Sequence, residues 1–364
     1  MSVKNKLFCM ITITFMIYGC SSADKDMKKL QEGSKSLSGS DFQKRDFSGF
    51  DLSNVVMERA NLNEALLKKT NLSKASINKS SFRAANLESA NLTGAICEET
   101  DFRDAKCAGA DLSAVKMANA DLRNADLRNV TFRGADLRGA RFYGSDLTGA
   151  DFTRADLKGA DFIRATLKKA KFEEARLIDV DMSGAFIIDA DFNNAEINGV
   201  NFFGADLRDS RLKNATISNT KFYFSRLTRV DLGGKKIPQA RMNGANLSGV
   251  NFVNASLSNA EMNGAEMSMV KLRGADLSGA KIIGSRLEDA DLSNANLSGV
   301  DFSGADLTNC DLRGANLSGA DLSSTNLRQA RLYGAVLDGT KIDAKYRDFI
   351  VSQGVKNDRV IWVR

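Results

Sequence analysis

The sequence has no histidine and a single proline, Pro238, among its 364 residues. Without histidine, the chain lacks the side chain that most often serves as general base and as metal ligand. Its five cysteines show none of the paired spacing that zinc sites use. No nucleophile–base pair and no phosphate-binding glycine loop stands out. We therefore expect no enzyme activity, no metal and no cofactor.

The chain also lacks an apolar run long enough to cross a bilayer. The run from Leu7 to Tyr18 has about 12 residues, whereas a spanning helix needs about 20. Lys4 and Lys6 precede it, and Cys20 follows it closely. A short apolar core behind positive charges is typical of a signal peptide, so we expect export.

The tetrad Ile17-Tyr18-Gly19-Cys20 resembles a bacterial lipobox, in which the cysteine receives lipid and becomes the first mature residue. The resemblance implies a signal peptide over 1–19 and a lipidated Cys20 followed by a tether to residue 36. Ser21 stands where Asp would retain a lipoprotein in the inner membrane. This implies the outer membrane, facing the periplasm. The alternative is an ordinary signal peptide, or a buried apolar segment, with an incidental cysteine.

Between residues 37 and 342 every fifth residue is apolar. From Ala60 to Thr340 a second register lies two residues ahead and holds small residues at every position but Lys235, as Ala120-Asp121-Leu122-Arg123-Asn124 illustrates. A five-residue period suits neither a helix nor a flat strand. It predicts a chain that turns a corner every five residues, with the large and small side chains inside and the Asp or Asn outside. Four corners close a coil of about 20 residues, and its filled interior leaves no ligand cavity.

The motif Ala-(Asp/Asn)-Leu-x-x occurs at Ala60-Asn61-Leu62, Ala110-Asp111-Leu112 and Ala315-Asn316-Leu317. In this the chain resembles the pentapeptide-repeat proteins. The resemblance implies an all-β fold, a right-handed quadrilateral β-helix over 37–342. It says little about activity, because one fold serves many functions.

Both ends of the coil need covers, because an open end exposes unpaired backbone. We expect a brief helix around Met27 to Leu30 at the start. At the other end, residues 343–364 are predicted to form a short helical cap, in which Asp343 begins a helix from Ala344 to Gln353. The alternative for 343–364 is a homodimer interface, as in gyrase-binding members of the family.

The repeat is disturbed at one place, where Lys235 occupies the small inward register and Pro238 follows. An unpaired lysine inside an apolar column would cost several kcal/mol. We expect residues 235–239 to bulge outward as one skipped unit. The alternative is a lysine that stays in register with a local distortion.

Two outward features are candidates for binding. An aromatic stripe consists of Tyr143, Ile163, Phe203 and Tyr223, which are separated by multiples of 20 residues, and of Phe224 beside the last of them. Basic residues outnumber acidic ones between residues 206 and 241, and this basic band includes Arg226, Arg229, Lys235, Lys236 and Arg241. Each feature has a structural alternative. The stripe could consist of neighbours that stack and so stabilise successive coils, and the basic band could be a solvated surface with Asp–Arg pairs such as Asp121 with Arg123.

These features favour a non-enzymatic envelope lipoprotein that acts as a rod-like scaffold or protein-binding module. Its membrane contact would be the N-terminal lipid, and its protein partner is not identified by the sequence. The alternative, implied by the family, is a cytoplasmic DNA mimic that binds gyrase. Mimicry needs a dense negative surface, whereas this chain has a net charge of +6. We expect no nucleic acid partner, since the positive excess is small and no recognition motif is present.

Overall fold

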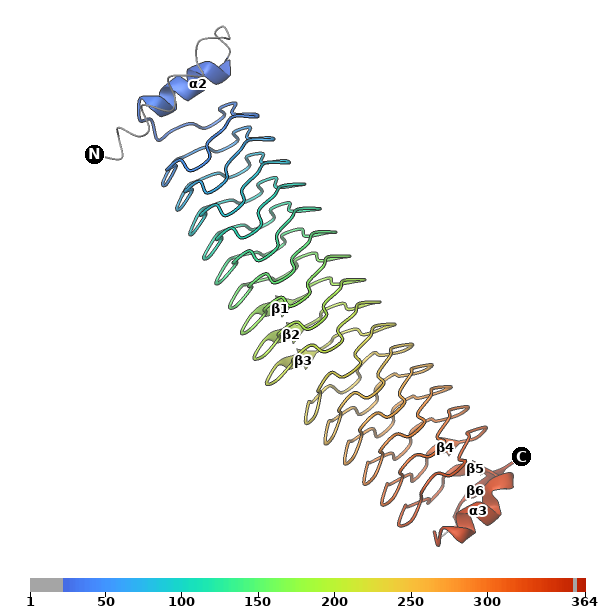
Figure 1. Cartoon of the computed structure of the whole chain (residues 1–364). Helices are drawn as coiled ribbons and strands as arrows, with labels where there is room; N and C mark the ends of the chain where they lie inside the picture. Colours follow the sequence, from blue (N-terminus) through green and yellow to red (C-terminus); the bar gives the residue numbers. More distant parts are fainter. Residues whose placement is uncertain (1–21, 356–358) are drawn as a thin grey trace. The chain divides into compact units, whose positions relative to one another are not determined.

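The fold is described from a computed structural model of the chain, which describes residues 22–355 and 359–364. The predicted signal peptide and Cys20 lie outside the described residues. The chain divides into two compact units, Met1–Ala175 and Arg176–Arg364, and each is described by itself (Figure 1). No helix in the described ranges has the length and apolar character that a membrane crossing requires.

Both units are built from successive coils joined by parallel backbone bridges between residues that lie 20 apart. Every five residues along a coil, one residue forms such a bridge. One coil of the first unit pairs with the next through Asp41↔Asn61, Asp46↔Leu66, Asp51↔Asn71 and Val56↔Ser76. Four bridged segments therefore make up each coil, as the five-residue period predicts.

In a few places the bridged segments are long enough to be strands. The second unit contains β1 (Arg176–Ile178), β2 (Glu196–Asn198) and β3 (Thr216–Ser218), which pair in parallel in that order. Near the C-terminus, β4 (Asp321–Leu322), β5 (Lys341–Asp343) and β6 (Ile361–Val363) form a second parallel sheet.

The interior of each coil is filled by the large and small registers. In the first unit, Phe132, Phe152 and Phe172 are fully buried and stack with ring centroids 5.1 and 5.0 Å apart. Burying one such side chain contributes roughly 1.5–3 kcal/mol. Alanine in the small register, as at Ala150, leaves room for the rings of the large register.

The Asp or Asn that precedes each large residue points outward and closes the corner. The Oδ1 atom of Asp51 accepts a hydrogen bond from the Ser53 amide at 3.0 Å and another from the Asn71 side chain at 2.9 Å. Asn71 repeats the turn contact with the amide of Ser73 at 3.1 Å. The side chain thus caps its own turn and joins neighbouring coils, which explains why the motif holds Asp or Asn at this place.

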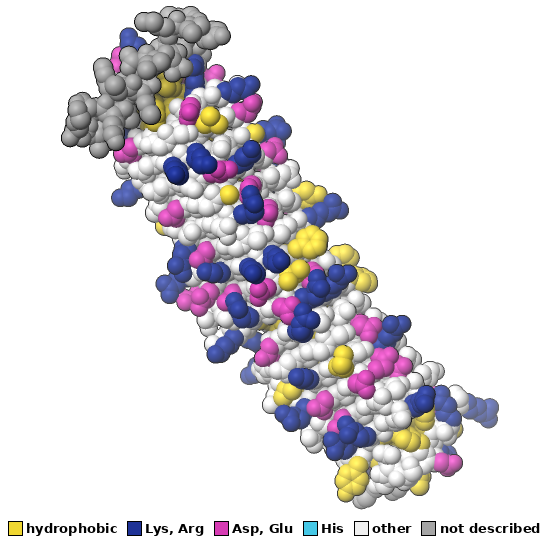
Figure 2. Space-filling model, viewed as in Figure 1, with side chains coloured by type: hydrophobic (Ala, Val, Ile, Leu, Met, Phe, Trp, Pro, Cys, Tyr) yellow, Lys and Arg dark blue, Asp and Glu magenta, His cyan; other side chains and the backbone are white. Residues whose placement is uncertain are grey.

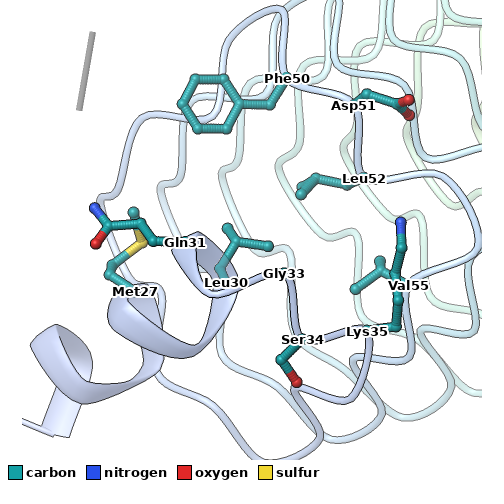
Figure 3. Close-up of a pocket in the computed structure, with 10 residues that line it drawn as sticks. All are labelled: Met27, Leu30, Gln31, Gly33, Ser34, Lys35, Phe50, Asp51, Leu52 and Val55. Carbon is teal, nitrogen blue, oxygen red and sulfur yellow. The ribbon is translucent and has the colours of Figure 1, made fainter. Parts of the chain in front are cut away.

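Helix α2 (Ser22–Gln31) lies at the start of the first unit (Figure 3). The Asp26 carboxylate accepts a hydrogen bond from the Asp41 amide at 3.2 Å and another from Lys29 Nζ at 2.8 Å. Met27 and Leu30 face a small cavity of 120 Å³, which Phe50, Leu52 and Val55 also line. The helix therefore contacts the first coils through both an apolar face and a carboxylate.

The C-terminal segment forms η1 (Ala344–Tyr346), α3 (Arg347–Ser352) and β6. Asp343 does not cap this helix, contrary to the sequence prediction: its Oδ1 accepts a hydrogen bond from the Ser324 amide at 3.0 Å. The Tyr346 hydroxyl oxygen accepts from the Leu327 amide at 3.1 Å. The segment thus provides acceptors for amides of the final coil, which has no further coil to pair with.

Candidate binding surface

Lys235 stays in the repeat, so the predicted outward bulge of 235–239 is wrong. Ile237 is buried in the large register, and Lys236 forms the expected bridge with Ser256. Lys235 occupies the small register and is half-buried. Its Nζ donates a hydrogen bond to the backbone carbonyl of Ala215 at 2.7 Å. The ammonium therefore obtains a polar partner without a change in the five-residue phase.

The ladder between coils is interrupted on the side of Lys235 that faces the preceding coil. The 20-residue spacing predicts backbone bridges between residues 211–220 and 231–240. No bridge forms between positions 211 and 231, and none forms between positions 216 and 236. The amides whose hydrogen bond to the neighbouring coil is missing there belong to Leu212, Asn214, Ile217, Asn219, Asp231, Lys236 and Arg241. Figure 1 shows the chain beyond β3 set apart from it at this point. We call this feature the interrupted ladder.

The same two coils remain joined on their other two segments. Asn201 bridges Lys221, and Asp206 bridges Arg226. The coil that carries Lys235 is also fully paired with the coil that follows, for example through the Ile237 amide and the Ser256 carbonyl at 2.9 Å. The opening is therefore a wedge that affects half of one coil-to-coil contact.

The wedge forms a cleft of 280 Å³ on the second unit. Its lining includes Ile217, Phe222 and Ile237 from the large register and the polar side chains of Asn219 and Gln239. Core residues along it are slightly exposed, at 7% for Ile217 and 4% for Ile237, whereas most of the large register is at 0–1%. The cleft thus exposes an apolar edge beside unpaired backbone groups.

The basic band does not behave as one group. Arg229 forms a two-pronged ion pair with Asp209 at 2.6 Å, and Arg226 lies 3.9 Å from the Asp206 carboxylate. Within the described part of the second unit, Lys236 and Arg241 form no ion pair, although both line the cleft. No acidic residue lines the cleft. Within the basic band, the side chains without an ion pair among the described residues therefore lie at the interrupted ladder.

The environment of Lys235 also affects its ionisation. Burial lowers the pKa of the ammonium below its usual value of 10.5, while the charge of Asp231 acts in the opposite direction. Asp231 is itself held by the Gly233 amide at 2.9 Å and by the side chain of Asn251 at 2.8 Å. The amine is therefore placed in a partly desolvated position, at a cost to the folded state.

The structure separates the aromatic stripe between the two units. Tyr143 and Ile163 belong to the first unit, where the Tyr143 hydroxyl lies 3.3 Å from Arg164. Phe203, Tyr223 and Phe224 belong to the second. On the face seen in Figure 2, hydrophobic groups form small clusters among charged side chains.

In the second unit, the exposed part of the stripe is a pair of rings in edge-to-face contact. The rings of Phe203 and Phe224 are 49% and 61% exposed and meet edge to face, with centroids 5.5 Å apart. Phe224 also covers Gly244, where an added Cβ would lie 2.5 Å from the ring. These contacts support the interpretation that the stripe stabilises neighbouring coils, and binding by it stays a prediction.

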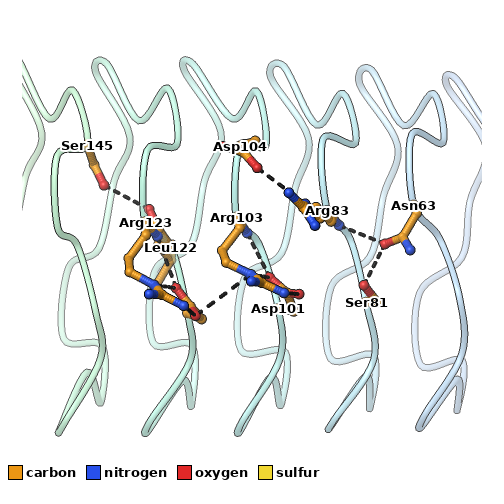
Figure 4. Close-up of polar contacts among 10 residues, drawn as sticks. Asn63, Ser81, Arg83, Asp101, Arg103, Asp104, Leu122, Arg123 and Ser145 are labelled. Carbon is orange, nitrogen blue, oxygen red and sulfur yellow. Dashed lines mark hydrogen bonds and ion pairs between the residues drawn. The ribbon is translucent and has the colours of Figure 1, made fainter.

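The Asp–Arg pairs expected on the surface are present. In the first unit, Arg123 Nη2 lies 2.6 Å from the Asp121 carboxylate, and Arg103 makes the same contact with Asp101 (Figure 4). Burial raises the pKa of Asp121, but hydrogen bonds from the Arg123 side chain and amide outweigh it, so the pKa lies below its usual value. Much of the acidic surface is thereby neutralised locally.

Metal-binding and thiol chemistry find no support in the described ranges. No group of three or more His, Cys, Asp or Glu side chains gathers there in a way that could hold a metal ion. Cys97, Cys107 and Cys310 are buried free thiols. Burial raises the pKa of Cys107 to about 12, so its reactive thiolate is scarce at neutral pH.

Sequence reasoning found Lys235 but missed the cleft. Ile217, Ser218 and Asn219 line it from the preceding coil, and their own sequence fits the repeat without any irregularity. The one feature of the sequence that could have predicted the cleft is the separation of 20 residues between Lys235 and Ala215, which places them on neighbouring coils. A large side chain at the first position must displace the coil that carries the second.

Solved structures similar to this chain include those of three proteins. A thylakoid lumen protein of Arabidopsis thaliana is 31% identical over 30% of this chain and 77% of its own, with a TM-score of 0.30. HetL of Nostoc sp. strain PCC 7120, involved in heterocyst differentiation regulation, is 24% identical over 88% and 99%, with a TM-score of 0.16. QnrB1, a plasmid-mediated fluoroquinolone resistance protein, is 20% identical over 55% and 90%, with a TM-score of 0.29. No curated protein matches the sequence.

The family model for pentapeptide repeats matches in eight copies. They cover residues 36–77, 80–117, 116–154, 155–194, 195–234, 240–279, 275–314 and 315–343. The segment 235–239, which holds Lys235 and Pro238, falls between two copies. The chain therefore belongs to the pentapeptide repeat family.

Proposed function

We propose that this protein is a non-enzymatic, lipid-anchored component of the bacterial envelope that binds another protein through its outer surface. One observation carries the binding role: the coils are filled by buried apolar side chains, whereas Lys236 and Arg241 form no ion pair among the described residues and lie beside an interrupted ladder. A filled interior leaves only outward groups for recognition. The right-handed, four-sided coil of the family would present those groups in columns.

The anchoring part of the proposal rests on the N-terminal sequence. Lys4 and Lys6, the apolar run to Tyr18 and the Gly19-Cys20 pair match the pattern of a lipoprotein signal. Ser21 in place of Asp favours the outer membrane, facing the periplasm. Stable anchoring needs more than one acyl chain, which the lipoprotein class supplies on its cysteine.

Metabolic labelling with an alkyne analogue of palmitate tests the anchor. We expect label on the full chain, loss of label in Cys20→Ala, and accumulation of the precursor with globomycin. Ser21→Asp is the matched control, because it should keep the label and move the protein to the inner membrane. An unlabelled precursor in the cytosol would overturn the anchoring proposal.

The alternative function is that of a cytoplasmic DNA mimic that binds gyrase. We retain it as a candidate because the chain belongs to the pentapeptide repeat family. A DNA-like surface requires dense uncompensated negative charge. The carboxylates of Asp101 and Asp121 are instead paired with arginines at 2.6 Å. Purified protein that protects gyrase from a fluoroquinolone in a supercoiling assay would favour the alternative.

A further inference from the structure

At the interrupted ladder, both backbone amides and backbone carbonyls lack backbone partners. On the β3 side, the amides of Ile217 and Asn219 lack acceptors. On the facing coil, the carbonyls of Lys236 and Pro238, which the repeat would place opposite these amides, accept no backbone hydrogen bond. Unpaired backbone groups at the edge of a parallel ladder form a template for another strand.

We propose that the cleft between residues 216–222 and 236–241 binds an extended, acidic polypeptide segment of another protein, which adds as a strand beside β3. This inference deepens the proposed protein-binding function and rests on it. A small anion could satisfy the amides but not the carbonyls. A polypeptide backbone supplies donors and acceptors alternately, so it can satisfy both sides of the cleft.

The charges around the cleft select the chemistry of the side chains. Lys236 and Arg241 line it, Lys221 lies in the segment that joins its two sides, and none of these three forms an ion pair in the described structure. Of the nearby carboxylates, Asp231 is held by the Gly233 amide and by Asn251 of the following coil, and Glu261, whose backbone is bridged to Arg241, forms no ion pair with it among the described residues. Acidic side chains on one side of an inserted strand would therefore meet uncompensated positive charge.

The other side of such a strand would meet apolar surface. Ile217, Phe222 and Ile237 line the cleft, and the opening leaves Ile217 and Ile237 slightly exposed there. Side chains of an extended strand alternate between its two faces. The expected ligand therefore alternates acidic residues with β-branched apolar ones.

Lys235 keeps the site open. Its Nζ donates to the Ala215 carbonyl at 2.7 Å, which is the acceptor that the Lys236 amide would use in an uninterrupted ladder. Nearly every other inward small position holds Ala, Ser, Thr, Val or Cys. Lys235→Ala should thus restore the repeat, close the ladder and remove the cleft without unfolding the chain.

A peptide-binding measurement tests the proposal. The probe is a fluorescein-labelled octapeptide of alternating Asp and Val, titrated with the full chain carrying Cys20→Ser and followed by fluorescence anisotropy. We expect saturable binding that weakens by about tenfold or more when Asp is replaced by Lys, and similarly when alternate amides are N-methylated, because each change removes one class of contact. Cys20→Ser separates this test from the anchoring test, since no lipid is involved.

Two variants decide where the peptide binds. Lys235→Ala should abolish binding while raising the melting temperature, which shows that the loss does not come from unfolding. Lys281→Ala, which removes an exposed lysine elsewhere in the second unit, should bind as the parent chain does. Equal binding by parent and Lys235→Ala would overturn the proposal, as would no binding at all.

Amide hydrogen exchange of the free chain provides an independent readout. The amides of Ile217 and Asn219 should exchange faster than those of Ile237 and Gln239, and the Asp-Val peptide should slow them. Equal protection of both pairs without peptide would show a closed ladder and overturn the proposal. So would a dimer, detected by sedimentation, that Lys235→Ala dissolves, because the occupant would then be a second copy of this chain.

Discussion

At the scale of single residues, place in the five-residue unit decides what a side chain does. Phe202 and Phe203 are neighbours of the same type, yet Phe202 is fully buried and Phe203 is 49% exposed. Phe202 stacks on Phe222 with centroids 5.3 Å apart, while Phe203 meets Phe224 on the outer surface. The same side chain therefore contributes to the core at one position and to the surface at the next.

Alanine substitutions at these neighbours should differ strongly in their cost. Phe202→Ala removes a fully buried ring and leaves a cavity, so we expect a loss of about 3–5 kcal/mol in the free energy of unfolding. Phe203→Ala removes one edge-to-face contact, and a loss below about 1.5 kcal/mol is expected. Urea unfolding followed by far-UV circular dichroism measures both. Similar losses at the two sites would contradict the assignment of inside and outside.

Which residues lie inside could be predicted for almost the whole repeat, because the five-residue period is sufficient for that purpose. The exception is Lys235, where two costs compete. The sequence prediction assumed that a buried ammonium costs more than a local bulge. In the structure, the ammonium finds the Ala215 carbonyl and the coils separate instead. Which of the two costs is smaller depends on the Ala215 carbonyl, 20 residues away. The five-residue spacing alone does not show whether that carbonyl is within reach of the ammonium.

At the scale of elements, the two ends of the coil were predicted unequally well. The expected helix around Met27 to Leu30 corresponds to α2 (Ser22–Gln31). The predicted helix from Ala344 to Gln353 is divided into η1 and α3, and Asp343 serves a different amide. The rule that an Asp before a helix caps its first amides considers the helix alone. Here the Ser324 amide, which has no further coil to pair with, takes the same carboxylate.

The attachment of α2 should depend on pH through Asp26. Burial raises the pKa of this carboxyl, but hydrogen bonds from Lys29 and the Asp41 amide have the larger, opposite effect. The pKa therefore lies below its usual value of 3.8. A carboxyl with a lower pKa in the folded state stabilises it above the unfolded pKa. This contribution is therefore complete above about pH 4 and is lost as the pH falls through the lower, folded value.

We therefore expect protection of the Asp41 amide to decrease at low pH, and Asp26→Asn to show reduced protection already at pH 7. Hydrogen-exchange protection factors, corrected for the intrinsic rate at each pH, measure both. Glu32→Gln is the matched control, because Glu32 forms only an exposed ion pair with Lys28 at 3.9 Å. Unchanged Asp41 protection in Asp26→Asn would contradict this anchoring role.

The C-terminal cap offers a second test at this scale. Tyr346→Phe removes the oxygen that accepts the Leu327 amide at 3.1 Å and leaves the ring in place. We expect a loss of about 1 kcal/mol and faster exchange of that amide. Tyr333→Phe is the control, since Tyr333 is 73% exposed. Equal exchange of Leu327 in both variants would argue against a capping role for Tyr346.

At the scale of the whole molecule, stability in a repeat protein is approximately the sum of its coils and of the contacts between successive coils. Most contacts in the second unit use all four bridged segments. The contact between residues 201–220 and 221–240 uses two of them, at Asn201↔Lys221 and Asp206↔Arg226. The cooperativity of this unit should therefore be weakest at that contact.

Function is the part of this protein that the sequence predicts least, and the reason is physical. The period specifies inward residues, which are alike in every coil, whereas recognition uses outward groups whose arrangement depends on neighbours 20 residues away. Arg226 and Arg229 seemed equivalent to Lys236 and Arg241 in the basic band. The structure pairs the first two with carboxylates and leaves the other two without an ion pair among the described residues.

The interrupted ladder should divide the unfolding of the second unit. Residues 231–343 end in the cap of η1, α3 and β6, whereas residues 176–219 have only half of a contact with the coil that follows. In hydrogen-exchange experiments at increasing urea concentration, 176–219 should lose protection before 231–343. Lys235→Ala should bring the two transitions together, because the restored hydrogen bonds would add on the order of a few kcal/mol to that contact.

Lys271→Ala is the control for this last experiment, since it removes an exposed lysine from a coil with a complete ladder. It should leave the two transitions apart. If the parent chain loses protection over both ranges at one urea concentration, the wedge does not weaken the contact between these coils. The hydrogen bonds retained at Asn201↔Lys221 and Asp206↔Arg226 would then be enough to hold the unit together as one cooperative body.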